Sequence, residues 1–150
     1  MKQVASHSDI MNSSIDWQAY YKECETVKSE LMIYSKDLRF LQQLLDRYFD
    51  KMIEIENLDE MRESLMLFQD VCYNCGRLKK RVKDQQKSLI EIIKGSNVYD
   101  QNTILDNQRA IKTSKLTLMD DFKMVKKEMY LIADHIIKVK KDNENLSFQV

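Results

Sequence analysis

Apolar side chains recur at alternating steps of three and four residues between Trp17 and Ile55. The positions are Trp17, Tyr20, Cys24, Val27, Leu31, Tyr34, Leu38, Leu41, Leu45, Tyr48, Met52 and Ile55. A period of about 3.5 residues keeps one apolar stripe facing a partner helix, as in a coiled coil. The pattern therefore predicts one long α-helix, over about 14–55, whose stripe has to be covered by other helices.

Two further segments carry stripes of the same kind. In the second, the stripe is Leu58, Met61, Leu65, Phe68, Cys72, Cys75, Val82, Leu89 and Ile93, with Val71, Leu78 and Ile92 beside it and the polar residues Lys79 and Gln86 within it. In the third, it is Ile104, Ile111, Leu118, Phe122, Val125, Met129, Ile132, Ile136, Val139 and Leu146, with the polar residues Gln108, Lys115 and Asn143. Polar residues in such a stripe fix register and partner number. Because they gather toward the 95–102 loop, we expect that half of the molecule to be the more polar and looser one.

Local signals divide the second and third segments. Asn57 with Glu60, and Thr103 with Asp106, have the residue types and spacing of N-terminal capping boxes. Gly95 follows the second stripe and can take the left-handed conformation that ends a helix. Together these signals predict helices over about 58–94 and 103–146.

Three stripes of similar length predict an all-α fold. We expect a long antiparallel three-helix bundle with coiled-coil-like heptad seams, up-down-up, over residues 14–147, and a disordered N-terminal tail over residues 1–13. The turn near residue 56 contains no glycine or proline. The alternative is therefore one helix of about 80 residues with a returning helix, which would require an oligomer.

Composition excludes several classes of function. The chain has 24 basic and 24 acidic residues, no proline and two glycines. Sandwiches and barrels need more turn residues, and a phosphate-binding glycine loop cannot be built from two distant glycines. We therefore expect no cofactor, no small-molecule substrate and no enzymatic activity. The odd number of cysteines, the lack of a leader pattern and the short apolar runs predict a cytoplasmic protein outside the membrane.

Cys72 and Cys75 form a CxxC pair, which can be a redox couple or half of a zinc site. A structural zinc needs four ligands, and Cys24 and His135 are expected at other levels of the bundle. Buried cysteine behaves as a small apolar residue. We therefore interpret both cysteines as core residues and expect no metal site.

His135 and Lys138 form a His-x-x-Lys pair on the third helix. This pair is similar to the one in histidine phosphotransfer domains, where an exposed helical histidine accepts a phosphoryl group. The resemblance implies that His135 is a phosphoacceptor and that Lys138 helps to hold the phosphoryl group. Val139 and Lys140 stand where that family has glycine or other small residues. We favour a solvated or edge-of-core histidine.

The second helix carries a run of basic residues, namely Arg77, Lys79, Lys80, Arg81, Lys83 and Lys87. One interpretation is a nucleic-acid-binding patch formed by Arg77, Lys80, Arg81, Lys83 and Lys87. The interpretation we favour is charge pairing with acidic residues of the first helix, which are Glu23, Glu25, Glu30 and Asp37. Nucleic-acid binding is therefore the second alternative, after phosphotransfer.

Large apolar residues also lie outside the three stripes. They are Ile33, Phe40, Leu44, Leu67, Met124 and Leu131. Surplus apolar surface of this kind marks interaction sites when it is contiguous. Our leading hypothesis is a non-enzymatic helical interaction or scaffold module, which acts through self-association as a homo-oligomer or through a partner helix.

Overall fold

A computed structural model describes residues 15–55, 58–96 and 98–148. Within these ranges the chain forms three helices and no strand: α2 (Trp17–Ile55), α3 (Leu58–Ile93) and α4 (Gln101–Phe148). The expected all-α class is confirmed. The expected N-terminal tail, residues 1–13, lies outside the described residues.

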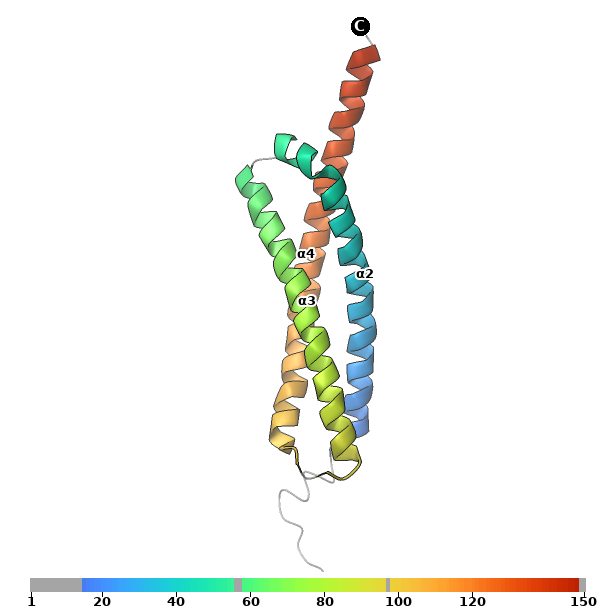
Figure 1. Ribbon diagram of the computed structural model, residues 1–150, viewed down its shortest axis with the longest axis vertical. Coiled ribbons are helices and arrows are strands. Elements are labelled where there is room, and N and C mark those ends of the chain that lie inside the picture. Colours follow the sequence, from blue (N-terminus) through green and yellow to red (C-terminus); the bar gives the residue numbers. More distant parts are fainter. Residues whose placement is uncertain (1–14, 56–57, 97, 149–150) are drawn as a thin grey trace, which may run out of the picture.

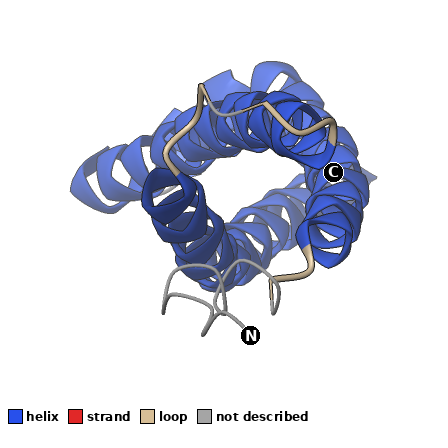
Figure 2. Ribbon diagram, turned by 90° about the horizontal axis from the view of Figure 1, so that it is seen from below, coloured by secondary structure: helices blue, strands red, loops and turns tan. Residues whose placement is uncertain are grey.

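The three helices lie alongside one another (Figure 1). α2 runs up the molecule, α3 returns beside it and α4 runs up again, so that its C-terminal part projects beyond the ends of the other two. Every pair of helices is in contact, and a view along the molecule shows the helices arranged around a common axis (Figure 2). The uninterrupted helix of about 80 residues is not formed, since α2 ends at Ile55 and α3 begins at Leu58.

Side chains that recur every three or four residues fill the space between the helices. The most completely buried are Leu31 and Leu41 of α2, Phe68, Val71, Val82 and Leu89 of α3, and Ile111, Val125 and Ile136 of α4. This spacing places them on one face of each helix. Removing that apolar surface from water is the main force that holds the helices together.

The buried face of α3 differs from the predicted stripe on one side only. Six predicted positions are buried, namely Met61, Phe68, Cys75, Val82, Gln86 and Leu89. Cys72, Lys79 and Ile93 are exposed, whereas Val71, Leu78 and Gln85 are buried. Adjacent residues on a helix point about 100° apart. The orientation found therefore keeps the Lys79 ammonium in solvent and buries the neighbouring Leu78.

Hydrogen bonds account for the helix ends that the structure describes. Asp16 caps α2, since its Oδ1 accepts a bond from the Ala19 amide at 3.0 Å. Gly95 has a φ of 90°, and the amides of Gly95 and Ser96 donate to the carbonyls of Ile92 and Glu91 at 2.9 Å. This Schellman motif confirms the expected glycine stop.

The predicted cap of the last helix is wrong. α4 begins at Gln101, and Asp100 accepts bonds from the Asn102 amide and the Thr103 hydroxyl, each at 3.1 Å. Asp100 supplies the acceptor one turn before Thr103, so that Thr103 lies inside the helix. The capping box predicted at Asn57 falls outside the described residues. No helix in the described ranges is long and apolar enough to span a bilayer.

Candidate functional site

The core near the loop between α3 and α4 contains a polar cluster built around Gln108. Its carboxamide nitrogen donates to the Tyr20 carbonyl at 3.2 Å and to a Glu23 carboxylate oxygen at 3.0 Å. Its carboxamide oxygen accepts from Gln85 at 3.0 Å and from the Cys24 thiol at 3.6 Å. Two donors and two acceptor positions are the full capacity of an amide side chain. Gln108 therefore connects all three helices with no bonding capacity left over.

Two residues around Gln108 complete this cluster. Gln85 also donates to the Ile104 carbonyl at 2.8 Å. Burial raises the pKa of the Cys24 thiol to about 11, partly offset by its bond to Gln108. The thiol therefore stays protonated at neutral pH and remains a donor. Sequence reasoning placed Gln108 and Gln86 in the stripes but missed Gln85, which lies on the side of α3 where each buried residue comes one position before the predicted one.

A second polar contact joins α2 and α3 at the same end. Gln86 donates to a Glu25 carboxylate oxygen at 2.6 Å and accepts from Lys28 at 3.4 Å. The bond from Gln86, with help from Lys28, holds the pKa of the Glu25 carboxyl below its usual range. The more polar end that the sequence predicts therefore exists, and its buried amides are largely paired.

The CxxC pair does not lie wholly in the core. Cys75 is buried and lies 3.6 Å from the Ser35 hydroxyl, but Cys72 is exposed on the side of α3. The interpretation of Cys72 as a core residue is therefore wrong, because Val71 takes the buried position. Among the described residues, no group of histidine, cysteine or acidic side chains is arranged to hold a metal ion.

The structure distributes the six surplus apolar residues over two faces of α4. Leu67 and Leu131 line one groove of about 580 Å³ between α3 and α4. On the other face, Leu44 lies against Met129 and Ala133 of α4. Ile33, Phe40, Met124 and Leu131 are exposed, whereas Leu44 and Leu67 are half-buried. Leu44 therefore does not form one surface with Leu67 and Leu131.

Aromatic rings meet on the face that joins α2 and α4. The Phe40 and Tyr130 rings lie 6.5 Å apart, both largely exposed. Ile33 lies seven residues before Phe40 and Ile137 seven residues after Tyr130, so both extend the same faces along the helices. We call Ile33, Phe40, Leu44, Tyr130 and Ile137 the α2–α4 strip. Sequence reasoning missed Tyr130 and Ile137, although their seven-residue spacing was visible.

His135 lies at the groove shared by Leu67 and Leu131. It is exposed, and Glu63 and Glu128 line the same groove. The Lys138 ammonium lies 3.5 Å from an Asp134 carboxylate oxygen and forms an ion pair with it. Two carboxylates beside His135 would repel an incoming phosphoryl group, so the surroundings of this histidine do not favour phosphotransfer.

The basic run of α3 does not pair with α2. Glu30 lies 2.9 Å from Lys115 and Asp37 lies 3.5 Å from Lys126, so these acids meet lysines of α4 instead. In the part of the chain that the structure describes, no ion pair involves Arg77, Lys80, Arg81, Lys83 or Lys87. The predicted charge pairing is therefore wrong, because Glu23, Glu30 and Asp37 face α4.

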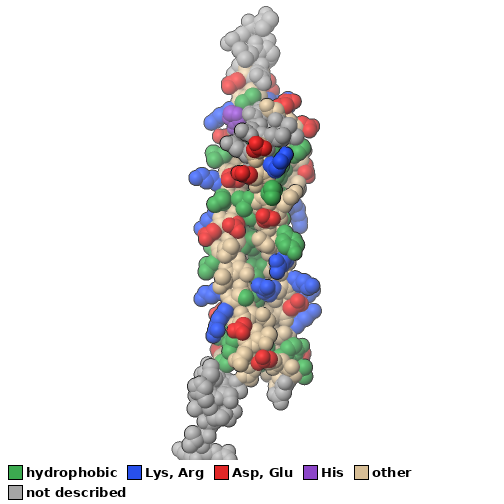
Figure 3. All heavy atoms as spheres, turned by 90° about the vertical axis from the view of Figure 1, so that its left-hand side faces the viewer, with side chains coloured by type: hydrophobic (Ala, Val, Ile, Leu, Met, Phe, Trp, Pro, Cys, Tyr) green, Lys and Arg blue, Asp and Glu red, His purple; other side chains and the backbone are tan. Residues whose placement is uncertain are grey.

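Basic and acidic side chains are interspersed on the face shown in Figure 3. The five predicted patch residues are all exposed. Arg77, Lys80 and Arg81 line grooves between α3 and α4, together with Asp84 and Asp121. Lys83 and Lys87 line neither groove, so the basic run is not one continuous patch.

Comparison with known proteins adds no relative. No family model matches the chain, and no match was found among curated proteins or solved structures. The function is therefore argued from the residues described above.

Proposed function

We propose that this chain is a non-enzymatic helical interaction module that acts through self-association. The observation that carries this proposal is the α2–α4 strip. Its largest members, Phe40 and Tyr130, are 47% and 44% exposed and lie with their rings in contact distance. Aromatic residues are enriched at protein interfaces because they bury much area with few rotatable bonds.

A second copy of the chain is the occupant that we propose for this strip. Phe40 and Tyr130 lie on either side of the line where α2 meets α4, and Asp37 and Lys126 beside them are already paired at 3.5 Å. The charges of Asp37 and Lys126 therefore stay paired when the strip is covered. The proposal also places the protein in the cytoplasm, which the odd number of cysteines and the protonated Cys24 thiol support.

We further infer that the three helices form an antiparallel, up-down-up bundle with coiled-coil-like heptad seams. Contacts between α2 and α4 support this, because they join residues at nearly constant separation, so these two helices run in the same direction, as an up-down-up order requires. Glu23 and Gln108 are 85 residues apart and Asp37 and Lys126 are 89 apart. Small-angle X-ray scattering tests the length: a rod of about 70 Å agrees with the bundle, whereas about 120 Å requires an uninterrupted helix.

Sedimentation velocity tests self-association of the full chain. We expect an oligomer that the double variant Phe40→Ser/Ile137→Ser dissociates. The matched control is Met32→Ser/Met66→Ser, which removes two side chains that are equally exposed, 57% and 58%, outside the strip. A monomer at every concentration would exclude self-association and leave a partner helix as the occupant. Equal dissociation by both double variants would exclude the strip.

A further inference from the structure

The groove between α3 and α4 contains two arginines one turn apart. Arg77 and Arg81 lie on α3, and both line a cavity of about 250 Å³ and an adjoining one of about 410 Å³. The Arg77 guanidinium lies 5.7 Å from the Tyr73 ring centre, and neither arginine belongs to an ion pair within the described ranges. Together with Lys80, which lines the second cavity, the groove therefore holds three positive charges that form no ion pair within the described ranges.

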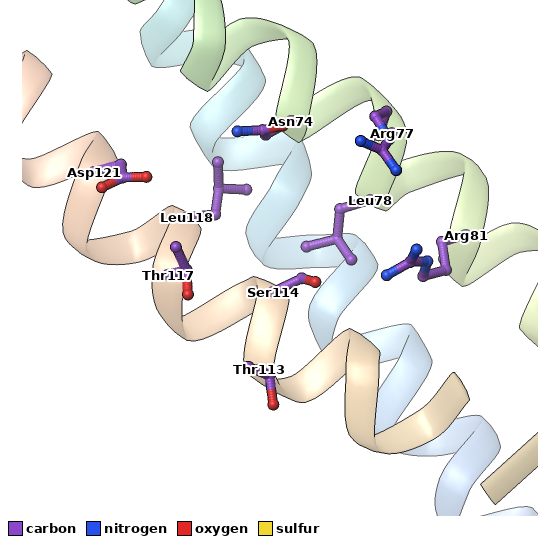
Figure 4. Close-up of a pocket in the computed structure, with 9 residues that line it drawn as sticks. All are labelled: Asn74, Arg77, Leu78, Arg81, Thr113, Ser114, Thr117, Leu118 and Asp121. Atoms are coloured by element: carbon purple, nitrogen blue, oxygen red, sulfur yellow. The ribbon is translucent and has the colours of Figure 1, made fainter. Parts of the chain in front are cut away.

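The opposite wall of the groove carries hydroxyl groups. Thr113, Ser114 and Thr117 of α4 line the first cavity together with Asn74 of α3. In Figure 4 the Ser114 hydroxyl and the Arg81 guanidinium point toward each other across the gap, and Leu78 and Leu118 lie between the two helices. Hydrogen-bond donors thus approach the same space from both helices.

These donors suit a tetrahedral oxyanion. A guanidinium presents a planar fork of N–H groups that matches two oxygens of a phosphate, and hydroxyls from another direction can bind the remaining oxygens. A carboxylate has two oxygens in one plane and would use only one wall of the groove. We propose that the α3–α4 groove binds a phosphomonoester group, with Arg77, Arg81 and Ser114 as its principal donors.

Each cavity of the groove also has one acidic residue in its wall. Asp121 lines the first cavity and Asp84 lines the adjoining one. A nucleic-acid backbone is a chain of phosphates that would extend past both carboxylates, whereas a single phosphate group beside Arg77 and Arg81 meets two positive charges, which the groove at His135 lacks. The ligand is therefore one phosphate group, carried by a small molecule or by a phosphorylated side chain, and the site is separate from the α2–α4 strip.

Nuclear magnetic resonance titration of the full chain with inorganic phosphate, at constant ionic strength set by sodium chloride, tests this site. We expect saturable shifts of the amide signals of residues 74–81 and 113–117. Arg77→Gln/Arg81→Gln should weaken binding at least about tenfold, because each arginine supplies charge-assisted hydrogen bonds. Lys83→Gln/Lys87→Gln removes the same charge from the same helix outside the groove and should leave the shifts unchanged. Circular dichroism confirms that both variants fold.

Three further probes distinguish the ligand. A phosphoserine peptide that binds more tightly than inorganic phosphate identifies a phosphorylated side chain, and equal binding identifies a free phosphate compound. Sodium acetate that produces the same shifts at the same concentration would overturn the choice of phosphate. Single-stranded DNA is the third probe. If it binds and both double variants weaken its binding equally, the whole basic run binds nucleic acid and the phosphate site is excluded. Arg77→Gln/Arg81→Gln should leave the oligomeric state of the chain unchanged. A loss of phosphate binding in this variant is then independent of self-association.

Discussion

The two ends of the core are filled in different ways. Near the loop between α3 and α4, the amides of Gln85, Gln86 and Gln108 are buried and bonded to groups on all three helices. Beyond the middle of the molecule the core consists of large apolar side chains, such as Leu41, Phe68 and Met129. Apolar burial is insensitive to direction, whereas each amide requires particular partners at particular positions.

This difference separates stability from specificity. Burial of each large apolar side chain contributes about 1.5–3 kcal/mol to the free energy of folding, and the apolar end contains little else. The polar end contributes less per residue, since a typical hydrogen bond adds about 1 kcal/mol net. Its amides instead penalise any arrangement in which their partners are missing. Substitutions at the two ends should therefore lower the free energy of unfolding by different amounts.

The largest effect is expected at the apolar end. Phe68→Ala removes a side chain that is 2% exposed and leaves a cavity, so the free energy of unfolding should fall by about 3–5 kcal/mol. Urea denaturation followed by circular dichroism measures it. Phe49, 42% exposed, is the matched control, and Phe49→Ala should cost under about 1 kcal/mol. Similar losses in both variants would contradict the assigned core.

An intermediate effect is expected at the polar end. Gln108→Ala removes one of the two acceptors of the buried Gln85 amide and a donor to the Tyr20 carbonyl, at a cost of about 1–3 kcal/mol. The same denaturation experiment applies. Gln42→Ala breaks an exposed bond to Asp46 within α2 and should change stability by less than about 0.5 kcal/mol. If Gln108→Ala costs more than Phe68→Ala, the division between the two ends is wrong.

A smaller effect is expected at an ion pair between α2 and α4. Glu30 and Lys115 are 33% and 23% exposed and lie 2.9 Å apart. Glu30→Gln should lower stability by about 0.5–1 kcal/mol at low salt and by less in concentrated sodium chloride. Asp106→Asn removes a far more exposed pair with Arg109 at 3.7 Å and should have no measurable effect. A loss for Glu30→Gln that salt does not alter would show that packing, and not charge, is responsible.

The smallest effect concerns pH. The Gln86 bond lowers the pKa of the Glu25 carboxyl in the folded state. This bond therefore stabilises the fold at any pH above the pKa that Glu25 has in the unfolded chain. The stabilisation is lost as the pH falls through the lower pKa that Glu25 has in the folded state. Gln86→Leu should return the carboxyl pKa of Glu25 toward its usual range, as measured by carbon nuclear magnetic resonance titration. Gln42→Leu is the control, and an equal Glu25 titration in both variants would exclude the bond.

The extent of the helices could be predicted from the sequence, because stripes of three- and four-residue steps leave little choice of secondary structure. One side of the buried face of α3 could not, although Met61, Phe68, Cys75, Val82 and Leu89 are buried as predicted. Val71 and Cys72 are both apolar, and which of them turns inward depends on where α4 lies. The cap of α4 was missed for a similar reason, since Asp100 and Thr103 are both good capping residues.

The candidate surfaces were predicted only in part. Phe40 was identified from its position outside the stripe, but its neighbour Tyr130 depends on which side of α4 faces α2. The basic run was visible in the sequence, yet the separation of Arg81 from Lys83 depends on where the groove lies. Contacts between helices distant in sequence are set by packing, which single-helix patterns do not encode.

The fully bonded amide of Gln108 has a mechanical consequence. If α4 slid by one turn along α2, all four of its hydrogen bonds would break together, with no spare atom to form a substitute. The Gln108 side chain therefore penalises every axial position of α4 except the one observed, and so sets the register of all three helices.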